Sequence, residues 1–167
     1  MFYRNVEISG NIIRNAHAHG ITVGETSGLI ISNNTVLQAL TEAEGGSLSI
    51  PSINVATSSL SVVVTNNVAP FLGSSLSGTR AGWTVANNLI VQVDNPKAAN
   101  YAGHLFADPF EDSGATVFDF RPVEGGLADQ MGVDLYAAAE SKIGDCEKRF
   151  GVAKVRSRGK KVAESEA

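Results

Sequence analysis

One short pattern occurs four times between residues 6 and 88: apolar residues alternate with others, and a turn-forming residue and an asparagine follow. The four asparagines, which we call the asparagine column, are Asn11, Asn34, Asn67 and Asn88. Five and three positions before each asparagine the residue is always apolar. These residues are Val6, Leu29, Val62 and Trp83, then Ile8, Ile31, Val64 and Val85. Alternation with one strictly apolar face predicts four strands that each bury one side.

The spacing of the asparagine column indicates the kind of repeat. Successive members lie 23, 33 and 21 residues apart, which suits one turn of a β-solenoid better than a helix pair. The stretch from Thr41 to Ser52 accounts for the longer spacing and reads as a loop. A second strand in each turn is predicted at Gly20–Gly24 and Ser52–Ala56, and more weakly near Ser74–Arg80. A leucine-rich repeat would need a leucine skeleton, which these units do not supply.

A stack of equivalent asparagines has a physical reason. Strands of successive turns lie about 4.8 Å apart, so equivalent side chains stand above one another. An asparagine amide both donates and accepts, so the column can hydrogen-bond along the stack and satisfy buried groups at a corner. Asparagine also tolerates the left-handed backbone of a tight turn, and the residues just before the column (Gly10, Asn33, Asn66 and Asn87) are turn-compatible too. We expect a structural role for the column.

The motif "IISNNTV" resembles the repeat of the right-handed parallel β-helix, or pectate-lyase-like, superfamily. A second similarity lies at His104–Asp134, where "FADP" and "DFRP" resemble the end of many secreted members, although the usual Ser-Pro-Ala is replaced by "EGGLADQMG". The resemblance covers about residues 3–134. It implies an all-β, right-handed parallel β-helix of about four to five coils. It also favours an extracellular or cell-surface location and a carbohydrate-active role, and the superfamily includes lyases, hydrolases, epimerases, phage tailspikes and non-catalytic members.

Composition sets further bounds on the 167-residue chain. The net charge of −4 gives no basic field that would favour nucleic acid, and no apolar run approaches the roughly 18 residues of a membrane helix. Cys146 is the single cysteine, so an intrachain disulfide is excluded. No signal peptide is evident at the N-terminus. We expect the coils and terminal segment in residues 1–135, and a short helix with a flexible basic tail in residues 136–167.

Histidines form the first candidate site. His17 and His19 alternate on an extended stretch and would share a face, with Arg14 and Glu25 at its ends. Such a pair can bind a metal ion or act as acid and base. No third metal ligand is identifiable, and histidines that hydrogen-bond the backbone at a corner are the alternative.

Two further sets of residues could bind ligands. Thr22 and Asn54 point outward from their strands and could contact a bound polysaccharide. Asp108, Glu111 and Asp112 could hold Ca²⁺ through carboxylate oxygens, although their spacing lacks the order of an EF-hand loop and acidic surface turns are common.

The function expected from these observations is a β-helix domain of a carbohydrate-active protein, either lyase-like or polysaccharide-binding. The alternative is a non-catalytic structural or adhesion solenoid, such as a phage tailspike-type module. Whether the chain is catalytic stays open. The first coil begins almost at Met1, so we expect a C-terminal portion of a longer solenoid, or a homo-oligomer that stacks through the N-terminal coil, most simply as a symmetric dimer.

Overall fold

The computed structural model describes residues 3–39, 49–109 and 119–131. Internal contacts divide the chain into two units, Met1–Leu135 and Tyr136–Ala167. The second unit lies outside the described residues, so the helix and basic tail expected there stay predictions. The loop expected at Thr41–Ser52 is likewise described only from residue 49, and its last residue begins a strand.

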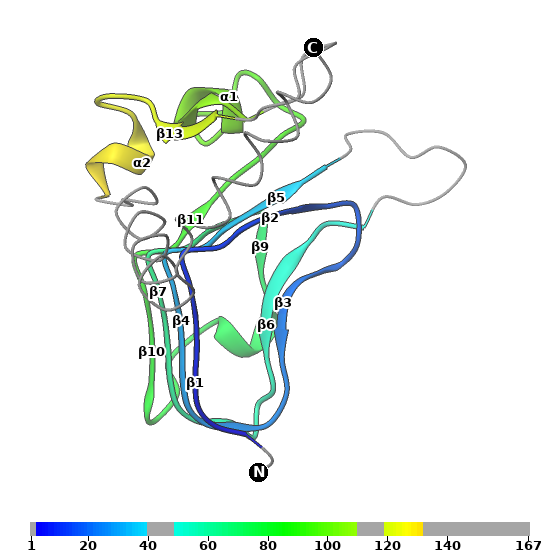
Figure 1. Cartoon of the computed structure of the whole chain (residues 1–167), viewed down its shortest axis with the longest axis vertical. Helices are drawn as coiled ribbons and strands as arrows, with labels where there is room; N and C mark the ends of the chain where they lie inside the picture. The colour runs from blue at the N-terminus through cyan, green and yellow to red at the C-terminus, as the bar shows by residue number, and fades with distance from the viewer. Residues whose placement is uncertain (1–2, 40–48, 110–118, 132–167) are drawn as a thin grey trace, which may run out of the picture. The chain divides into compact units, whose positions relative to one another are not determined.

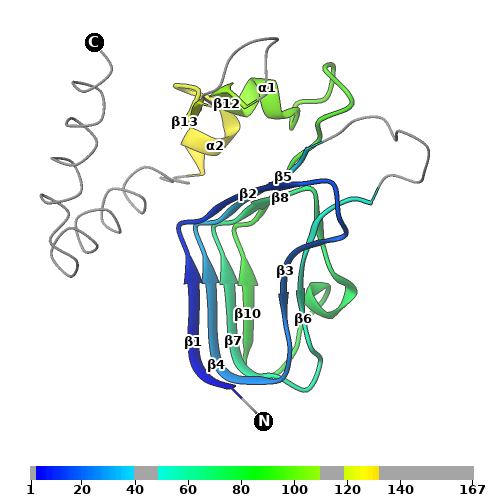
Figure 2. The ribbon, with the colours of Figure 1, turned by 45° about the vertical axis from the view of Figure 1, so that its right-hand side comes forward.

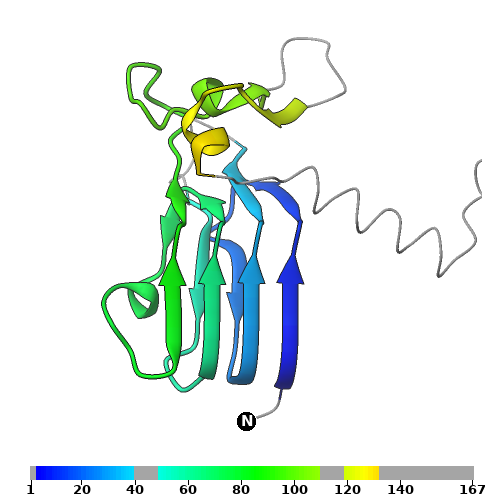
Figure 3. The same cartoon turned by 90° about the vertical axis from the view of Figure 1, so that its left-hand side faces the viewer.

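Most strands of the first unit lie in three parallel sheets (Figure 1). The first sheet contains β1 (Tyr3–Ser9), β4 (Thr26–Ser32), β7 (Leu60–Thr65) and β10 (Trp83–Ala86). The second contains β2 (Ile12–Asn15), β5 (Thr35–Gln38), β8 (Val68–Ala69) and β11 (Leu89–Ile90). The third contains β3 (His19–Val23), β6 (Ser52–Val55) and β9 (Phe71–Leu72). Figures 2 and 3 show the strands of the first sheet side by side and pointing the same way.

The chain visits the three sheets in turn, so each of the first three repeats adds one strand to each sheet, and the fourth adds a strand to the first and second sheets. We number the repeats 1 (β1–β3), 2 (β4–β6), 3 (β7–β9) and 4 (β10 and β11). The predicted all-β character and parallel pairing are confirmed, and the arrangement is compatible with a solenoid. Two expectations about the strands were incomplete. Each of the first three repeats has three strands, not two, and the strand expected near Ser74–Arg80 lies earlier, at β9, followed by the 3₁₀ turn η1 (Ser74–Leu76).

The strand register of the first sheet explains why equivalent positions of the repeats are apolar. Val6 pairs with Leu29, Leu29 with Val62, and Val62 with Trp83, so equivalent residues of all four repeats share one inner face. The central members Leu29 and Val62 are fully buried, while Val6 and Trp83, on the edge strands, are partly buried. Ile90 pairs with the buried Ala69 but is itself 41% exposed, because β11 is an edge strand.

The asparagine column hydrogen-bonds in one direction along the stack. The backbone N–H and the side-chain amide of Asn11 both donate to Oδ1 of Asn34, at 3.1 and 2.8 Å. Asn34 makes the same two bonds to Asn67 (3.0 and 2.9 Å), and Asn67 makes them to Asn88 (3.0 and 2.9 Å). Each amide also donates to the carbonyl two residues before it in its own repeat. The predicted side-chain hydrogen bonds between strands are therefore present.

Left-handed backbone occurs beside the asparagine column, but the column residues themselves do not adopt it. Positive φ occurs one position earlier, at Gly10 (61°), Asn33 (54°), Asn66 (56°) and Asn87 (54°). A second left-handed set, which the sequence analysis missed, consists of Asn5 (53°), Gly28 (76°), Ser61 (53°) and Gly82 (74°). The register of the first sheet aligns both sets across the repeats. Each repeat therefore has a left-handed residue toward each end of its first strand.

A second core lies between the second sheet and the segment that follows it. That segment contains α1 (Ala102–Leu105), β12 (Phe106–Asp108), β13 (Asp119–Pro122) and α2 (Leu127–Gln130). β12 and β13, which carry the "FADP" and "DFRP" motifs, pair antiparallel. The rings of Phe106 and Phe120 meet edge to face at 5.9 Å. Buried members of this core include Leu37, Val68, Leu89, Val91, Ala102, Leu105, Phe106 and Ala128. The inner strands of the second sheet, β5 and β8, are thus covered on both faces.

We predict that the cost of removing an asparagine depends on its place in the column. Asn34→Ala leaves the Asn11 donors and the Ile8 carbonyl without their fully buried partner and lowers the free energy of unfolding by about 1–3 kcal/mol. Asn88→Ala, at the partly buried end, costs less. Urea denaturation measures both. Equal losses, or none for Asn34→Ala, would contradict the structural role.

Thr35→Val should stabilise the protein. The Thr35 hydroxyl is buried without a hydrogen-bond partner among the described residues. Its registered neighbours Ile12 and Val68 are apolar, so valine fits the position. Removing an unsatisfied hydroxyl should raise the free energy of unfolding by about 1 kcal/mol. Thr65→Val, at a partly buried position whose side chain faces outward, is the matched control in the same urea titration, and a loss at Thr35 would show that the hydroxyl is bonded.

Candidate functional site

The outer face of the β3-β6-β9 sheet carries three of the polar residues singled out from the sequence: His19, Thr22 and Asn54. Two rows cross its strands. In the first row, His19 is in register with Ser52, and Ser52 with Phe71. In the second row, Thr22 is in register with Asn54. We call these five residues, together with Gly73 after β9, the outer face.

Hydrogen bonds fix the histidine end of the outer face. The Nδ1 atom of His19 lies 2.9 Å from the hydroxyl oxygen of Thr22, so both side chains stand on the same side of β3. The His17 ring accepts a hydrogen bond from the His19 backbone N–H through Nδ1 at 3.3 Å, and the two ring centroids lie 5.0 Å apart. Both rings are exposed. The two expected histidines therefore do lie together.

Asn54 occupies the centre of the outer face. Its amide donates to the Ser52 hydroxyl, which in turn donates to the Ala18 carbonyl at 2.9 Å. Gly73 faces the same amide: a Cβ at Gly73 would overlap the Asn54 Oδ1 atom. The backbone N–H of Gly73 donates to the Ile53 carbonyl at 2.9 Å, which fixes its position. The absent side chain at Gly73 therefore leaves room for the Asn54 amide.

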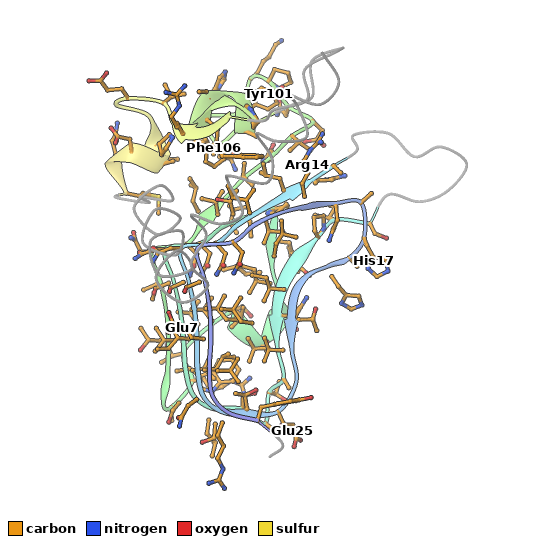
Figure 4. The ribbon with its side chains drawn as sticks, viewed as in Figure 1. Glu7, Arg14, His17, Glu25, Tyr101 and Phe106 are labelled. Atoms are coloured by element: carbon orange, nitrogen blue, oxygen red, sulfur yellow. The ribbon has the colours of Figure 1, made fainter. Side chains whose placement is uncertain are left out.

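Arg14 and Glu25 do not join the histidines in one cluster. Arg14 lies in β2, and its guanidinium donates to the Ala39 carbonyl at 3.4 Å. Glu25 lies after β3 and accepts a hydrogen bond from the Ser58 hydroxyl at 2.9 Å. Figure 4 shows His17 and Glu25 near opposite ends of β3. Of the four residues, only the two histidines form a close pair.

The predicted calcium ligands can be placed only in part. Asp108 ends β12, where its backbone pairs with Asp119. Glu111 and Asp112 lie outside the described residues, so the Ca²⁺ hypothesis stays a prediction. Within the described ranges, no group of three or more His, Cys, Asp and Glu side chains is arranged to hold a metal ion. None of the helices described there has the length and apolar character needed to span a membrane.

The first sheet carries a shallow hollow on its outer side. Asn5, Glu7, Gly28, Ile30 and Ser61 contribute to its lining. Ile30 is 43% exposed, and three of the lining residues, Asn5, Gly28 and Ser61, have left-handed backbone. Glu7, labelled in Figure 4, also accepts a hydrogen bond from Ser9 at 2.9 Å. Glu7 is the one ionisable side chain of this hollow, so the outer face offers the richer set of hydrogen-bonding groups.

Phe71 and Gly73 are the members of the outer face that the sequence analysis did not identify. Phe71 is 54% exposed although it is a large aromatic residue. The run "APFLG" (residues 69–73) offers only a short signal: an apolar pair followed by a glycine, the residue that also ends the predicted strand Gly20–Gly24. The strand was missed because it has only two residues.

No protein-family model matches the chain, and neither the curated proteins nor the solved structures contain a significant match to it.

A glycine pair tests the packing of the outer face. Gly73→Ala forces the Asn54 amide to move and should lower the free energy of unfolding by about 1–3 kcal/mol. Gly24→Ala is the matched control, because a Cβ there meets no atom within 4 Å. Gly24→Ala should leave stability unchanged or raise it by about 0.4–1 kcal/mol. Thermal and urea unfolding measure the stability of both variants. An unchanged free energy of unfolding for Gly73→Ala would contradict the close packing of Asn54 against Gly73.

Proposed function

We propose that the chain is a right-handed parallel β-helix domain of the pectate-lyase-like kind, and that it binds a polysaccharide along the outer face. The observation that carries the proposal is the pair of registered rows on β3, β6 and β9. The family resemblance of the sequence supports the same choice of ligand. A secreted or cell-surface location would follow from this role.

The chemistry of the outer face suits a sugar chain. Sugars present hydroxyl groups, which both donate and accept, and Thr22 and Asn54 offer both functions in neighbouring positions. Phe71 adds an exposed aromatic ring, and such a ring supplies flat apolar contact area for the C–H face of a sugar. Ligand sites commonly combine an aromatic surface with a few placed polar groups.

The spacing of the outer face suits a chain more than a single ring. Neighbouring strands lie about 4.8 Å apart, so His19 and Phe71, with Ser52 between them, are about 10 Å apart across the sheet. That distance matches about two sugar units. A polymer crossing the strands would meet polar groups of β3 and β6 first and the Phe71 ring next. Binding, rather than bond cleavage, is the role proposed for the outer face, because none of its residues carries a carboxylate.

Substitutions on the outer face should weaken binding to the polysaccharide. A panel of soluble acidic and neutral polysaccharides in affinity electrophoresis identifies a retarding polymer, which then serves in calorimetry. Phe71→Ala and Thr22→Val should each weaken binding about tenfold, the loss of one contact worth about 1.4 kcal/mol. Thr84→Val, an exposed threonine on β10, is the matched control.

Two results would overturn the proposal. One is the absence of retardation by every polymer in the panel. The other is equal loss in the Thr84→Val control, which would place the bound polymer elsewhere. Release of unsaturated products by the wild-type protein, seen as rising ultraviolet absorbance, would replace the binding role with lyase activity.

A further inference from the structure

One tripeptide of the second repeat differs from its equivalents in the later repeats. Asn33-Asn34-Thr35 is the single Asn-x-Ser/Thr sequence in the chain. In secreted proteins the first asparagine of such a sequence is the acceptor of N-linked glycans. The third and fourth repeats keep the asparagine pair but place an apolar residue after it, Val68 or Leu89. The threonine therefore distinguishes this corner from the corners that are otherwise like it.

The Thr35 hydroxyl has no hydrogen-bonding role in the described fold. It is fully buried and makes no hydrogen bond to any described residue. Its registered neighbours Ile12 and Val68 are apolar, so the position itself suits a valine. A buried hydroxyl without a partner lowers stability, and such a group in a folded protein calls for an explanation. The threonine at this position therefore indicates a role other than packing.

The Asn33 side chain also differs from its equivalents, Asn66 and Asn87. The amide of Asn87 donates to Oδ1 of Asn66 at 2.6 Å and to the Met131 carbonyl at 3.3 Å. The Asn33 side chain makes no hydrogen bond within the described ranges. Asn33 is partly exposed and has left-handed backbone at the corner between β4 and β5. A group attached to its amide nitrogen would therefore displace no hydrogen bond of the described structure.

We propose that Asn33 is a site of N-linked glycosylation and that the Thr35 hydroxyl serves the recognition of this acceptor sequence. The donor is an oligosaccharide joined to a lipid through a diphosphate. The Nδ2 atom of Asn33 attacks the anomeric carbon of the first sugar, so a C–N bond forms. The C–O bond to the diphosphate breaks, the lipid diphosphate leaves, and a base of the transferase takes the amide proton.

The burial of Thr35 sets the order of events. In the folded chain the Thr35 hydroxyl is out of reach of a transferase, so the glycan is added before this corner folds. In the unfolded chain, as during export, Asn33 and Thr35 are both accessible. The inference rests on the secreted location in the proposed function. It does not depend on polysaccharide binding, because the outer face is built on β3, β6 and β9, away from the corner that carries Asn33.

Secretion of the full chain from a eukaryotic host, behind a cleavable leader, tests the proposal by mass spectrometry. The intact protein should carry the mass of one glycan on most molecules. Enzymatic release of the glycan in heavy-oxygen water converts the modified asparagine into a labelled aspartate, and peptide analysis should place that label at residue 33. Asn33→Gln and Thr35→Val should each abolish the modification, and Thr35→Ser should keep it at lower occupancy. Asn66→Gln, at the equivalent corner of the third repeat, is the matched control and should leave the glycan unchanged.

Three results would each overturn the proposal. These are an unmodified mass for the secreted and folded protein, a label at another asparagine, and a glycan that persists in Thr35→Val. Circular dichroism shows that each secreted variant is folded. Because Thr35→Val should stabilise the protein, loss of the glycan in that variant is not a consequence of misfolding. The mass measurement needs no polysaccharide, so its outcome is separate from that of the proposed binding function.

Discussion

A hydrogen bond from one asparagine to the next is the interaction on which the stacking of the repeats depends. The corner after the first strand of each repeat would bury backbone groups that no strand pairing can satisfy. The column satisfies them with one side chain per repeat, because an asparagine amide donates and accepts at once. The bond joins the same positions in successive repeats, so it also fixes their register. Slippage by one residue would break the column and turn the apolar faces outward.

The sequence predicted the parts of the fold that alternate. The strands of the first sheet bury one face only, and period-2 alternation marked them. The second sheet was harder to read because its inner strands, β5 and β8, are buried on both faces. Its strands have apolar residues at consecutive positions, such as Val68 and Ala69, and such runs carry no periodicity. The segment with α1 and β12 packs on the outer side of this sheet. Its sequence motif was identified, but its packing against the sheet was not predicted.

The residues with left-handed backbone were likewise predicted only in part from the sequence. Those beside the column were identified because glycine and asparagine favour positive φ. The second set contains Ser61, which gives no such signal, and its alignment becomes visible only when the sheet register is known. For the candidate site, spacing placed His17 and His19 together and Thr22 beside Asn54. It could not bring in Phe71 or Gly73, because a two-residue strand leaves too short a pattern to read.

The central claim, that the column carries backbone hydrogen bonds from repeat to repeat, is tested most directly by amide hydrogen exchange. Nuclear magnetic resonance can follow the backbone N–H of each asparagine. Those of Asn34 and Asn67 each donate to the side-chain oxygen of the next asparagine at 3.0 Å and should exchange only when the protein unfolds. The Asn88 N–H should exchange rapidly. Equal exchange at Asn34 and Asn88 would contradict the account.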